Sequence, residues 1–469
     1  MLDKMSMNQE IKALGITRMQ AVKWLMAIIL PLLIMLIPVS ETYTSEMRMF
    51  FILTGICILV MAFDLMEMII PALALPLMYI LSGLGTPAIV FKPWLGIVPW
   101  MNLFGLMLAS ILLSTGLLTR VAYWCIIKTG ATYNGMLYAI MAAGIVFNFI
   151  IPGNTLLPMA ALTYSICTAL DLGKSKESAG IMLAGFFGSI IPGYMVYSNN
   201  FVMFQGVGMA VTDVSIPWLT YLIHNIALLP YSFLIIFMLT KVLKPDVKIE
   251  GKVYFEKAYK ELGKLALTEK KAIVISIVLF AMFLTSSIHN IQPAWIFLIL
   301  IIVSFLPGVN IGTKESLASV NYTFIFLITG CMAIGEVSST LGVGQWISNM
   351  ILGVISGSNI FVILVVVWLL AFLLNFLLTP VAIAAVVTVP LTEMALGLSI
   401  SPFVIYYALM QGSSQIIFPY EWPFAFLFFS FGLIPIKHFI KVFSITSLMN
   451  LIYFMVIMIP FWRLIHLIG

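Results

Sequence analysis

Residues 147–155 read FNFIIPGNT and interrupt a long apolar run, and residues 374–382 read LNFLLTPVA and interrupt another. In both stretches an asparagine, Asn148 or Asn375, is followed by a phenylalanine, two aliphatic residues and then a break. Proline and glycine disturb a helix at such points. Each stretch is typical of the tip of a re-entrant hairpin, in which two half-length helices enter and leave a membrane on one side. We predict these hairpins over residues 134–172 and 358–398.

The composition of the chain is that of a membrane protein. Of its 469 residues, 62% are hydrophobic and 9% are charged, whereas about 25% of residues are charged in a soluble domain. Uncharged runs such as 359–378 and 442–461 reach the roughly 20 apolar residues that a helix needs to cross the hydrocarbon layer. The sequence therefore predicts an all-α polytopic membrane protein with about 11 transmembrane helices besides the two hairpins. The net charge of +5 is expected in loops at the membrane surface and does not indicate nucleic acid.

Lysine and arginine residues mark the sides of the membrane. Nine of the 23 basic residues fall within 241–271, and none lies between Lys314 and Lys437. Because loops rich in Lys and Arg stay on the cytoplasmic side, we predict a cytoplasmic linker at 243–271 that carries an amphipathic helix. The same rule places the N-terminus inside, and a helix over about 100–121 then ends at the inner surface. Basic residues flank the first hairpin but not the second, so the hairpins are expected to enter from opposite sides.

The matched hairpins belong to two longer repeats. The turn STGL at 114–117, before the first hairpin, has a counterpart in STLG at 339–342, before the second. A broken helix and a closing helix are expected after each hairpin. Two such halves of opposite orientation form an inverted repeat, which is typical of secondary transporters and places the binding site at the repeat interface. The predicted units are a tail with the first transmembrane helix (1–47), repeat 1 (48–242), the linker (243–271) and repeat 2 (272–469).

Four expected breaks in the helices indicate where the binding site lies. They are 152–155 and 379–382 at the hairpin tips, and 192–200 and 418–423 in the broken helices. Unwound backbone persists in a membrane only where protein or a watery cavity covers it. Free N–H groups at a half-helix N-terminus favour an anion, and free carbonyls favour Na⁺. For the substrate we select Gly153, Asn154, Thr155, Ser198, Asn199, Asn200, Thr379, Pro380 and Ala382. For cation or proton coupling we select Asn154, Thr155, Ser413, Ser414 and Glu421.

Glu421 needs the most explanation, because an ionisable group at membrane depth usually marks function. It would bind Na⁺, carry a coupling proton or face a cationic group of the substrate, unless it lies at the membrane surface. A cation or proton antiporter that uses Glu421 therefore stays open as a second interpretation. A channel fits less well, since paired broken helices favour alternating access. An intramembrane enzyme fits least, because the sequence has no HExxH, no nucleophile elbow and no paired aspartates within an apolar run.

Over most of its length the chain resembles the divalent anion–sodium symporter family, also called the dicarboxylate transporter family. The resemblance rests on STGLLTRVA at 114–122, LGKLALTEKK at 262–271, the GNT tip and the order of the elements. It implies an elevator-type transporter that works as a homodimer and carries di- or tricarboxylates or sulfate. The family has a Ser-Asn-Thr motif at both tips, which would hold substrate carboxylates and shape the Na⁺ sites. Here the first tip keeps Asn154 and Thr155, and the second keeps only Thr379.

We therefore expect a secondary active transporter in the cytoplasmic membrane that moves small di- or tricarboxylate anions by cation-coupled symport or by anion exchange. Its expected partners are the small anion, membrane lipid and a second copy of the chain. We expect no enzymatic activity, no cofactor other than Na⁺ or H⁺ as the coupling ion, and no metal site other than Na⁺ at the same loops.

Overall fold

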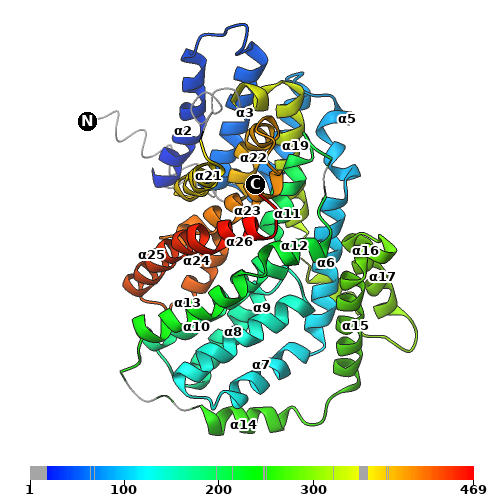
Figure 1. Ribbon diagram of the computed structural model, residues 1–469, viewed down its shortest axis with the longest axis vertical. Coiled ribbons are helices and arrows are strands. Elements are labelled where there is room, and N and C mark those ends of the chain that lie inside the picture. Colours follow the sequence, from blue (N-terminus) through cyan, green and yellow to red (C-terminus); the bar gives the residue numbers. More distant parts are fainter. Residues whose placement is uncertain are drawn as a thin grey trace.

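The computed structural model describes residues 18–63, 65–67, 69–196, 198–213, 215–246, 249, 251–320, 322–347, 358–376, 378 and 380–468. Within these ranges, the side chains of Ala62, Asn199, Ser287, Phe324, Tyr420 and Pro423 are not part of the description. All of the regular elements assigned in the described residues are helices (Figure 1). The predicted all-α architecture is therefore confirmed.

The N-terminal helices pack in sequence onto one another and onto α19 (Thr323–Thr340). Tyr79 lies fully buried in the apolar cluster that they share, and its hydroxyl forms a 2.5 Å hydrogen bond with that of Thr54. The helices of this layer are α2 (Arg18–Leu32), η1 (Leu33–Leu36), α3 (Ser45–Ala62), α4 (Ile69–Leu81), α5 (Pro87–Val90) and η2 (Lys92–Leu95).

The next helices contain the first hairpin and the helices around it. They are α6 (Ile97–Ser114), α7 (Leu117–Lys128), α8 (Tyr133–Ile150), α9 (Leu156–Ala169), α10 (Lys176–Val196), α11 (Asn199–Gly208), α12 (Trp218–Asn225) and α13 (Leu228–Val242). The hairpin consists of α8 and α9, and both helices pack against α10. Although α10 is long and apolar enough to cross a membrane, it is buried along its length. It therefore lies in the interior of the protein and not against lipid.

The linker and the second half continue the chain. Their elements are α14 (Lys252–Glu261), α15 (Leu267–Leu284), α16 (Ser286–His289), α17 (Pro293–Phe305), α18 (Lys314–Ala318), α19, α21 (Ile360–Leu374), α22 (Pro380–Gly397), α23 (Pro402–Ser413), η3 (Pro419–Glu421), α24 (Pro423–Ser430), α25 (Ile436–Tyr453), η4 (Phe454–Met458) and α26 (Ile459–Leu464). Here α21 and α22 form the second hairpin, and both pack against α23. Figure 1 shows the first hairpin in the lower half of the view, near α7 and α14, and the second in the upper half, near α3 and α19.

Several helices of the described residues could cross a membrane. Six are long and apolar enough, or seven if the pair α12 and α13, bent by 49° at their junction, counts as one span. Shorter apolar helices of 10–17 residues accompany them, among them α9 and α21, one arm of each hairpin. This mixture of full-length and half-length apolar helices is expected of a membrane protein that contains re-entrant and broken helices.

Glycines end the helices that precede the two hairpins. Helix α6 stops at Ser114 because Gly116 takes a left-handed conformation with φ +82°, and α19 stops at Thr340, two residues before Gly342 with φ +71°. Glycine adopts this conformation without a steric penalty and commonly ends helices. The expected helix over 100–121 is therefore wrong at its end, since the residues after Gly116 form the separate helix α7. The two glycines lie in the STGL and STLG turns that the sequence aligns.

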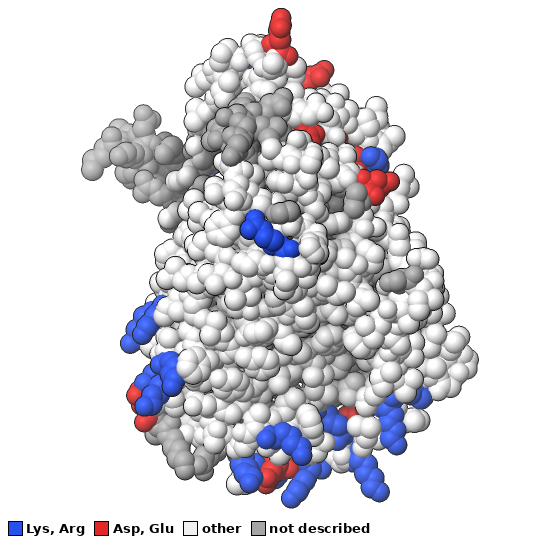
Figure 2. Space-filling model, viewed as in Figure 1, with Lys and Arg blue, Asp and Glu red and all other residues white. Residues whose placement is uncertain are grey.

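Charged side chains are distributed unequally between the two ends of the molecule. Figure 2 shows most of the Lys and Arg residues in view at the end where α14 lies, whereas acidic residues outnumber basic ones at the opposite end. We call these the basic end and the acidic end. Uncharged surface covers most of the face between them, as expected of a protein whose middle lies in a bilayer.

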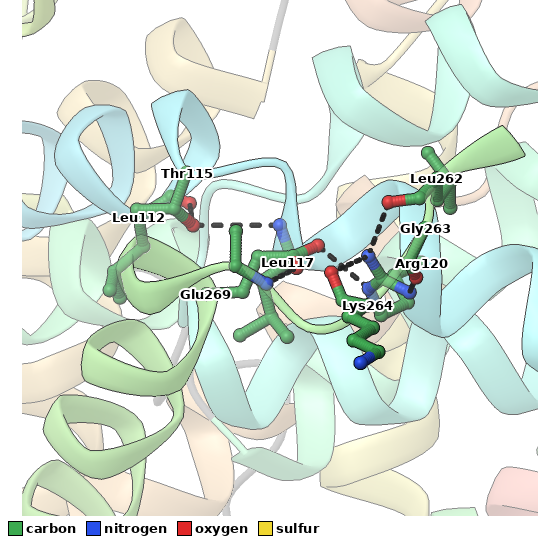
Figure 3. Close-up of polar contacts among 9 residues, drawn as sticks. Leu112, Thr115, Leu117, Arg120, Leu262, Gly263, Lys264 and Glu269 are labelled. Carbon is green, nitrogen blue, oxygen red and sulfur yellow. Dashed lines mark hydrogen bonds and ion pairs between the residues drawn. The ribbon is translucent and has the colours of Figure 1, made fainter.

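An ion pair at the basic end joins the first half to the linker (Figure 3). The Arg120 guanidinium, on α7, donates to the Glu269 carboxylate at 2.8 Å and to the carbonyls of Leu262 and Gly263 at 3.1 Å. Both charged side chains are largely buried. The other Glu269 oxygen accepts the N–H of Ala266 at 2.7 Å. These contacts unite STGLLTRVA with LGKLALTEKK, and the hydrogen bond from Arg120, together with its charge, lowers the pKa of the Glu269 carboxyl below its ordinary value.

Candidate functional site

The two broken helices meet inside the protein, at Asn200 and Ser414, which lie 214 residues apart in the sequence. Asn200 lies in the first turn of α11, and its amide nitrogen is 3.4 Å from the Ser414 hydroxyl just after α23. The rings of Phe186 on α10 and Trp422 pack edge to face, with their centroids 5.8 Å apart. Helix α11 also packs along α22 and α23. The interruptions of the two halves are therefore adjacent, as a site at the repeat interface requires.

The first break is shorter than the sequence indicates. The predicted interruption at 192–200 is wrong in its extent, because α10 continues through Pro192 to Val196 and α11 resumes at Asn199. Proline has no N–H, so the Gly188 carbonyl loses its helical partner. The buried amide of Asn148 takes that place, with its nitrogen 3.5 Å from the Gly188 oxygen and 3.1 Å from the Ser189 oxygen. Pro192 is tolerated because a side chain from the hairpin compensates for the missing donor.

Side-chain hydroxyls complete the first break. The Ser198 hydroxyl caps α11 by accepting the N–H of Phe201 at 3.3 Å. The Tyr221 hydroxyl donates to the Tyr194 carbonyl at 2.6 Å. Free backbone groups near the end of α10 are thus bonded by neutral side chains, as buried polar groups in a membrane must be.

The tip of the first hairpin has two polar residues with different surroundings. Gly153 forms the turn with φ +73°. Thr155 is buried, and its hydroxyl donates to the Ser189 carbonyl at 3.2 Å, so it binds the tip to α10. Asn154 is only partly buried, and its amide donates to the Pro152 carbonyl in its own loop at 3.1 Å. Of the two residues selected for both substrate and cation binding, Asn154 is the one that keeps an accessible side chain.

The second break begins earlier than the sequence indicates. The predicted interruption at 418–423 is wrong at its start, because α23 ends at Ser413 and α24 starts at Pro423, with the short η3 between them. Ser413 is therefore the last helical residue, and Ser414 lies within the break. The Ser414 hydroxyl donates to the Met410 carbonyl at 2.6 Å. Asn375, the match of Asn148, donates to the Ser413 carbonyl at 2.8 Å.

Glu421 closes the second break from inside. Its side chain is 2% exposed, and its two carboxylate oxygens accept the N–H groups of Phe418 at 2.9 Å and Ile417 at 3.2 Å. Among the described residues, no Lys, Arg or His lies within ion-pair distance of it. The expectation that it lies at membrane depth fits this burial, but its contacts are those of a residue that shapes the loop. No sequence signal distinguishes such a capping carboxylate from a coupling one.

The remaining predicted residues fall into different surroundings. Thr379 lies outside the described residues, and so does the side chain of Asn199. Pro380 begins α22. Ala382 is buried in the apolar cluster that contains Tyr79 and Val337, on the side of α4 and α19. The structure thus brings Asn200 and Ser414 together and joins Thr155 to α10, whereas Ala382 faces another part of the protein.

Three buried amides near the breaks were not selected from the sequence. Asn148 and Asn375 are both 1% exposed, and within the described part of the chain neither side-chain oxygen has a hydrogen-bond partner. Gln411, one turn before the second break, is fully buried with neither end of its amide bonded to a described residue. The signal for the asparagines was their shared position in the two halves. Searched over the described residues, no group of three or more His, Cys, Asp or Glu could hold a metal ion.

Comparisons with known proteins agree with this architecture. The family model of the sodium:sulfate symporter transmembrane region matches residues 18–468. Among solved structures, the chain is similar to the YdaH transporter of Alcanivorax borkumensis, whose crystal structure is described as having an unusual topology. That likeness has a TM-score of 0.53 at 14% sequence identity and covers 83% of this chain and 88% of that one, so it concerns the fold alone. None of the curated proteins compared with the chain matches it.

Proposed function

Since this chain belongs to the sodium:sulfate symporter family and is therefore a secondary transporter in a membrane, we propose that it carries a small di- or tricarboxylate anion coupled to a cation gradient. Sulfate, the anion in the family's description, shares the double negative charge of a dicarboxylate. The proposed substrate class is therefore an anion of at least two charges, with dicarboxylates as first choice. Transport by symport is favoured over exchange because a cation would offset the charge of Glu421 and of the anion.

The observation that carries this proposal is the contact between the two breaks at Asn200 and Ser414. Helices α11 and α24 both begin at these breaks, and the N-terminus of a half-helix favours negative charge. No Lys or Arg occurs in the sequence of the breaks at 197–200 and 414–422. An anion there would be held by neutral donors and helix ends, with Asn154, at the hairpin tip that Thr155 binds to α10, proposed as a further donor. We propose Na⁺ as the coupling cation, because carbonyl oxygens at unwound helices are typical Na⁺ ligands.

The charge distribution supports a proposed orientation in the cytoplasmic membrane. Loops rich in Lys and Arg remain on the cytoplasmic side, so the basic end with α14 and the linker would be inside (Figure 2). The N-terminus is proposed to be inside as well. The two hairpins lie toward opposite ends of the molecule (Figure 1), which supports an inverted repeat. Elevator-type movement and a homodimer complete the proposal, and both come from the family resemblance.

The transport assay uses purified full-length protein in liposomes. Uptake of labelled succinate, citrate and sulfate is measured with and without an inward Na⁺ gradient and, separately, with a proton gradient. We expect Na⁺-dependent uptake of at least one of these anions, with succinate the fastest. Cation flux driven by a proton gradient without uptake of any of the anions would instead support an antiporter and overturn the proposal.

Asn154→Ala tests the assigned tip. We expect uptake to fall at least about tenfold, because the substitution removes a donor from the proposed site, while the protein remains folded. Asn225→Ala is the matched control, since the Asn225 amide donates to the Tyr221 carbonyl in its own helix at 3.0 Å and lies outside both breaks. Uptake by Asn154→Ala equal to that of the control would contradict the assignment.

A further inference from the structure

Asn148 and Asn375 occupy the same place in the two hairpins. Asn148 lies in the last turn of α8, and Asn375 comes directly after α21, so each ends the first arm of its hairpin. Both are 1% exposed. In both cases the side-chain amide binds main-chain oxygen atoms of the broken helix that follows, and the Asn148 amide also bonds within its own helix. A buried amide that reaches the same target in two halves of a chain points to a shared role.

In the first half, a close approach of two backbones makes this contact geometrically accessible. A Cβ atom on Gly144 would collide with the Gly188 carbonyl, so α8 and α10 touch main chain to main chain there. The Asn148 nitrogen donates to the Gly144 oxygen at 2.9 Å and to the Ser189 oxygen at 3.1 Å. The neighbouring Gly188 carbonyl is the one that Pro192 leaves without a helical donor. Asn148 thus binds the part of α10 that lacks a complete helical ladder.

In the second half, the same geometry recurs with different residues. A Cβ atom on Gly412 would collide with the Trp368 carbonyl, so α21 and α23 touch in the same manner. The Asn375 nitrogen donates to the Ser413 oxygen at 2.8 Å and to the Gln415 oxygen at 2.9 Å. The Ser413 carbonyl lacks its helical donor because the amide of the residue four positions on is bonded to Glu421. Asn375 thus binds the carbonyls that the break exposes.

We propose that Asn148 and Asn375 are equivalent positioning residues, each of which fixes the carbonyls of a broken helix to its own hairpin so that the two bind solute as one unit. Only the identity of the bound solute in this inference rests on the proposed function. An unfixed carbonyl near a break would turn toward other donors, and the anion and cation sites beside it would lose their shape. The side-chain N–H groups of the asparagines, and not their oxygens, carry the role.

Substitution by aspartate separates the two ends of the amide. Asn148→Asp and Asn375→Asp keep the size and the side-chain oxygen but remove both N–H donors. We expect each variant to raise the half-saturating anion concentration for uptake at least about tenfold, with a smaller change in the maximal rate per folded transporter. Asn225→Asp is the control, because its amide is equally buried and donates to the Tyr221 carbonyl, which belongs to neither break, and it should leave the half-saturating concentration within about twofold. If the Asp variants do not fold, Asn148→Leu and Asn375→Leu, which remove the same donors without adding a charge, replace them.

A distance measurement tests the proposal without transport. Spin labels at Leu373 on α21 and Phe426 on α24, both more than half exposed, report the second hairpin against its broken helix. The four native cysteines are buried, so cysteines introduced at these two sites are labelled selectively. We expect Asn375→Asp to broaden the distance distribution and Asn148→Asp to leave it unchanged, whatever anion the protein carries. Wild-type distances and half-saturating concentrations in both Asp variants would overturn the proposal, as would an equal effect of Asn225→Asp.

Discussion

In the first half of the chain, α10 runs through Pro192 and stops only at Val196, and α11 resumes almost at once. In the second half, α23 stops at Ser413 and regular α-helix returns only at Pro423. The short break is satisfied by neutral side chains, with Ser198 as the cap of α11. The long break has more free N–H groups, and a carboxylate is placed among them.

The two breaks meet one physical requirement with two kinds of chemistry. Backbone groups that are unbonded at membrane depth cost several kcal/mol each, so both breaks must supply partners for them. Glu421 supplies two acceptors at once, and in its ionised form it adds a negative charge to the interior. An anion bound near the second break would be repelled by that charge, whereas the first break has no such residue. The proposed coupling cation therefore has its larger electrostatic effect in the second half.

Of the changes that test this comparison, removal of the Glu421 carboxylate should cause the largest loss of stability. Glu421→Ala removes the acceptor from the partly buried amides of Ile417 and Phe418, and each unsatisfied donor costs about 1–3 kcal/mol. We expect a loss of about 4 kcal/mol in stability, with Glu421→Gln intermediate because its amide retains one acceptor. Thermal unfolding in detergent, followed by tryptophan fluorescence, measures this loss. A Glu421→Ala protein as stable as wild type, with only its ion dependence altered, would show that Glu421 couples transport and does not shape the loop.

A second test compares the turns before the two hairpins. Arg120 follows Gly116 by four residues and forms a buried ion pair with Glu269. Trp346 follows Gly342 by four residues and packs on Tyr43, with ring centroids 5.0 Å apart. The matched positions are thus held by an ion pair at the basic end and by aromatic rings in the other half. Removing one partner of a buried ion pair costs about 3 kcal/mol, whereas an aromatic pair contributes about 1 kcal/mol beyond its buried area.

We therefore expect Arg120→Leu to destabilise the protein by about 3 kcal/mol and Trp346→Leu by less. The stability from the Glu269 pair should also depend on pH. Because Arg120 lowers the pKa of Glu269 in the folded protein, this contribution is complete above the ordinary carboxyl pKa and is lost as pH falls through the lowered value. Melting temperatures at pH 7 and under more acidic conditions should thus converge between wild type and Arg120→Leu. An unchanged difference at low pH would mean that Arg120 acts through the carbonyls of Leu262 and Gly263 alone.

Much of the fold could be predicted from the sequence because its signals are local. Apolar runs, the GNT tip and the matched asparagines are periodic or compositional features, and they place the hairpins and the helical class. The predicted helix over 100–121 runs past the true end of α6, because the apolar pattern continues beyond Gly116, although glycine is the stronger signal for a helix end. The extent of the first break was misplaced for another reason. Pro192 normally interrupts a helix, and its tolerance depends on Asn148, a residue 44 positions earlier.

The candidate site was only partly predictable, because its contacts join segments that lie far apart in the sequence. The sequence selects Asn200 within a predicted break and Ser414 just before another, and the structure brings them together. The role of Asn375 could not be inferred, because a buried asparagine in an apolar run does not reveal which carbonyls it binds. The sequence favours coupling for Glu421, because a carboxylate in an apolar run has the same sequence pattern whether it binds an ion or main-chain amides. Such roles depend on contacts between distant segments.

The smallest effect is expected from Pro192 and Asn148 together, and it bears directly on why the first break is short. Pro192→Ala restores an N–H that donates to the Gly188 carbonyl, so that carbonyl no longer depends on Asn148. Asn148→Asp should then be less harmful in the Pro192→Ala background, with a coupling of about 0.5–1 kcal/mol in a double-mutant cycle of unfolding. The coupling stays small because the Asn148 amide also bonds to Ser189 and Gly144. Strict additivity would mean that Asn148 does not compensate for the proline, and that the matched contacts of the two halves arise from packing alone.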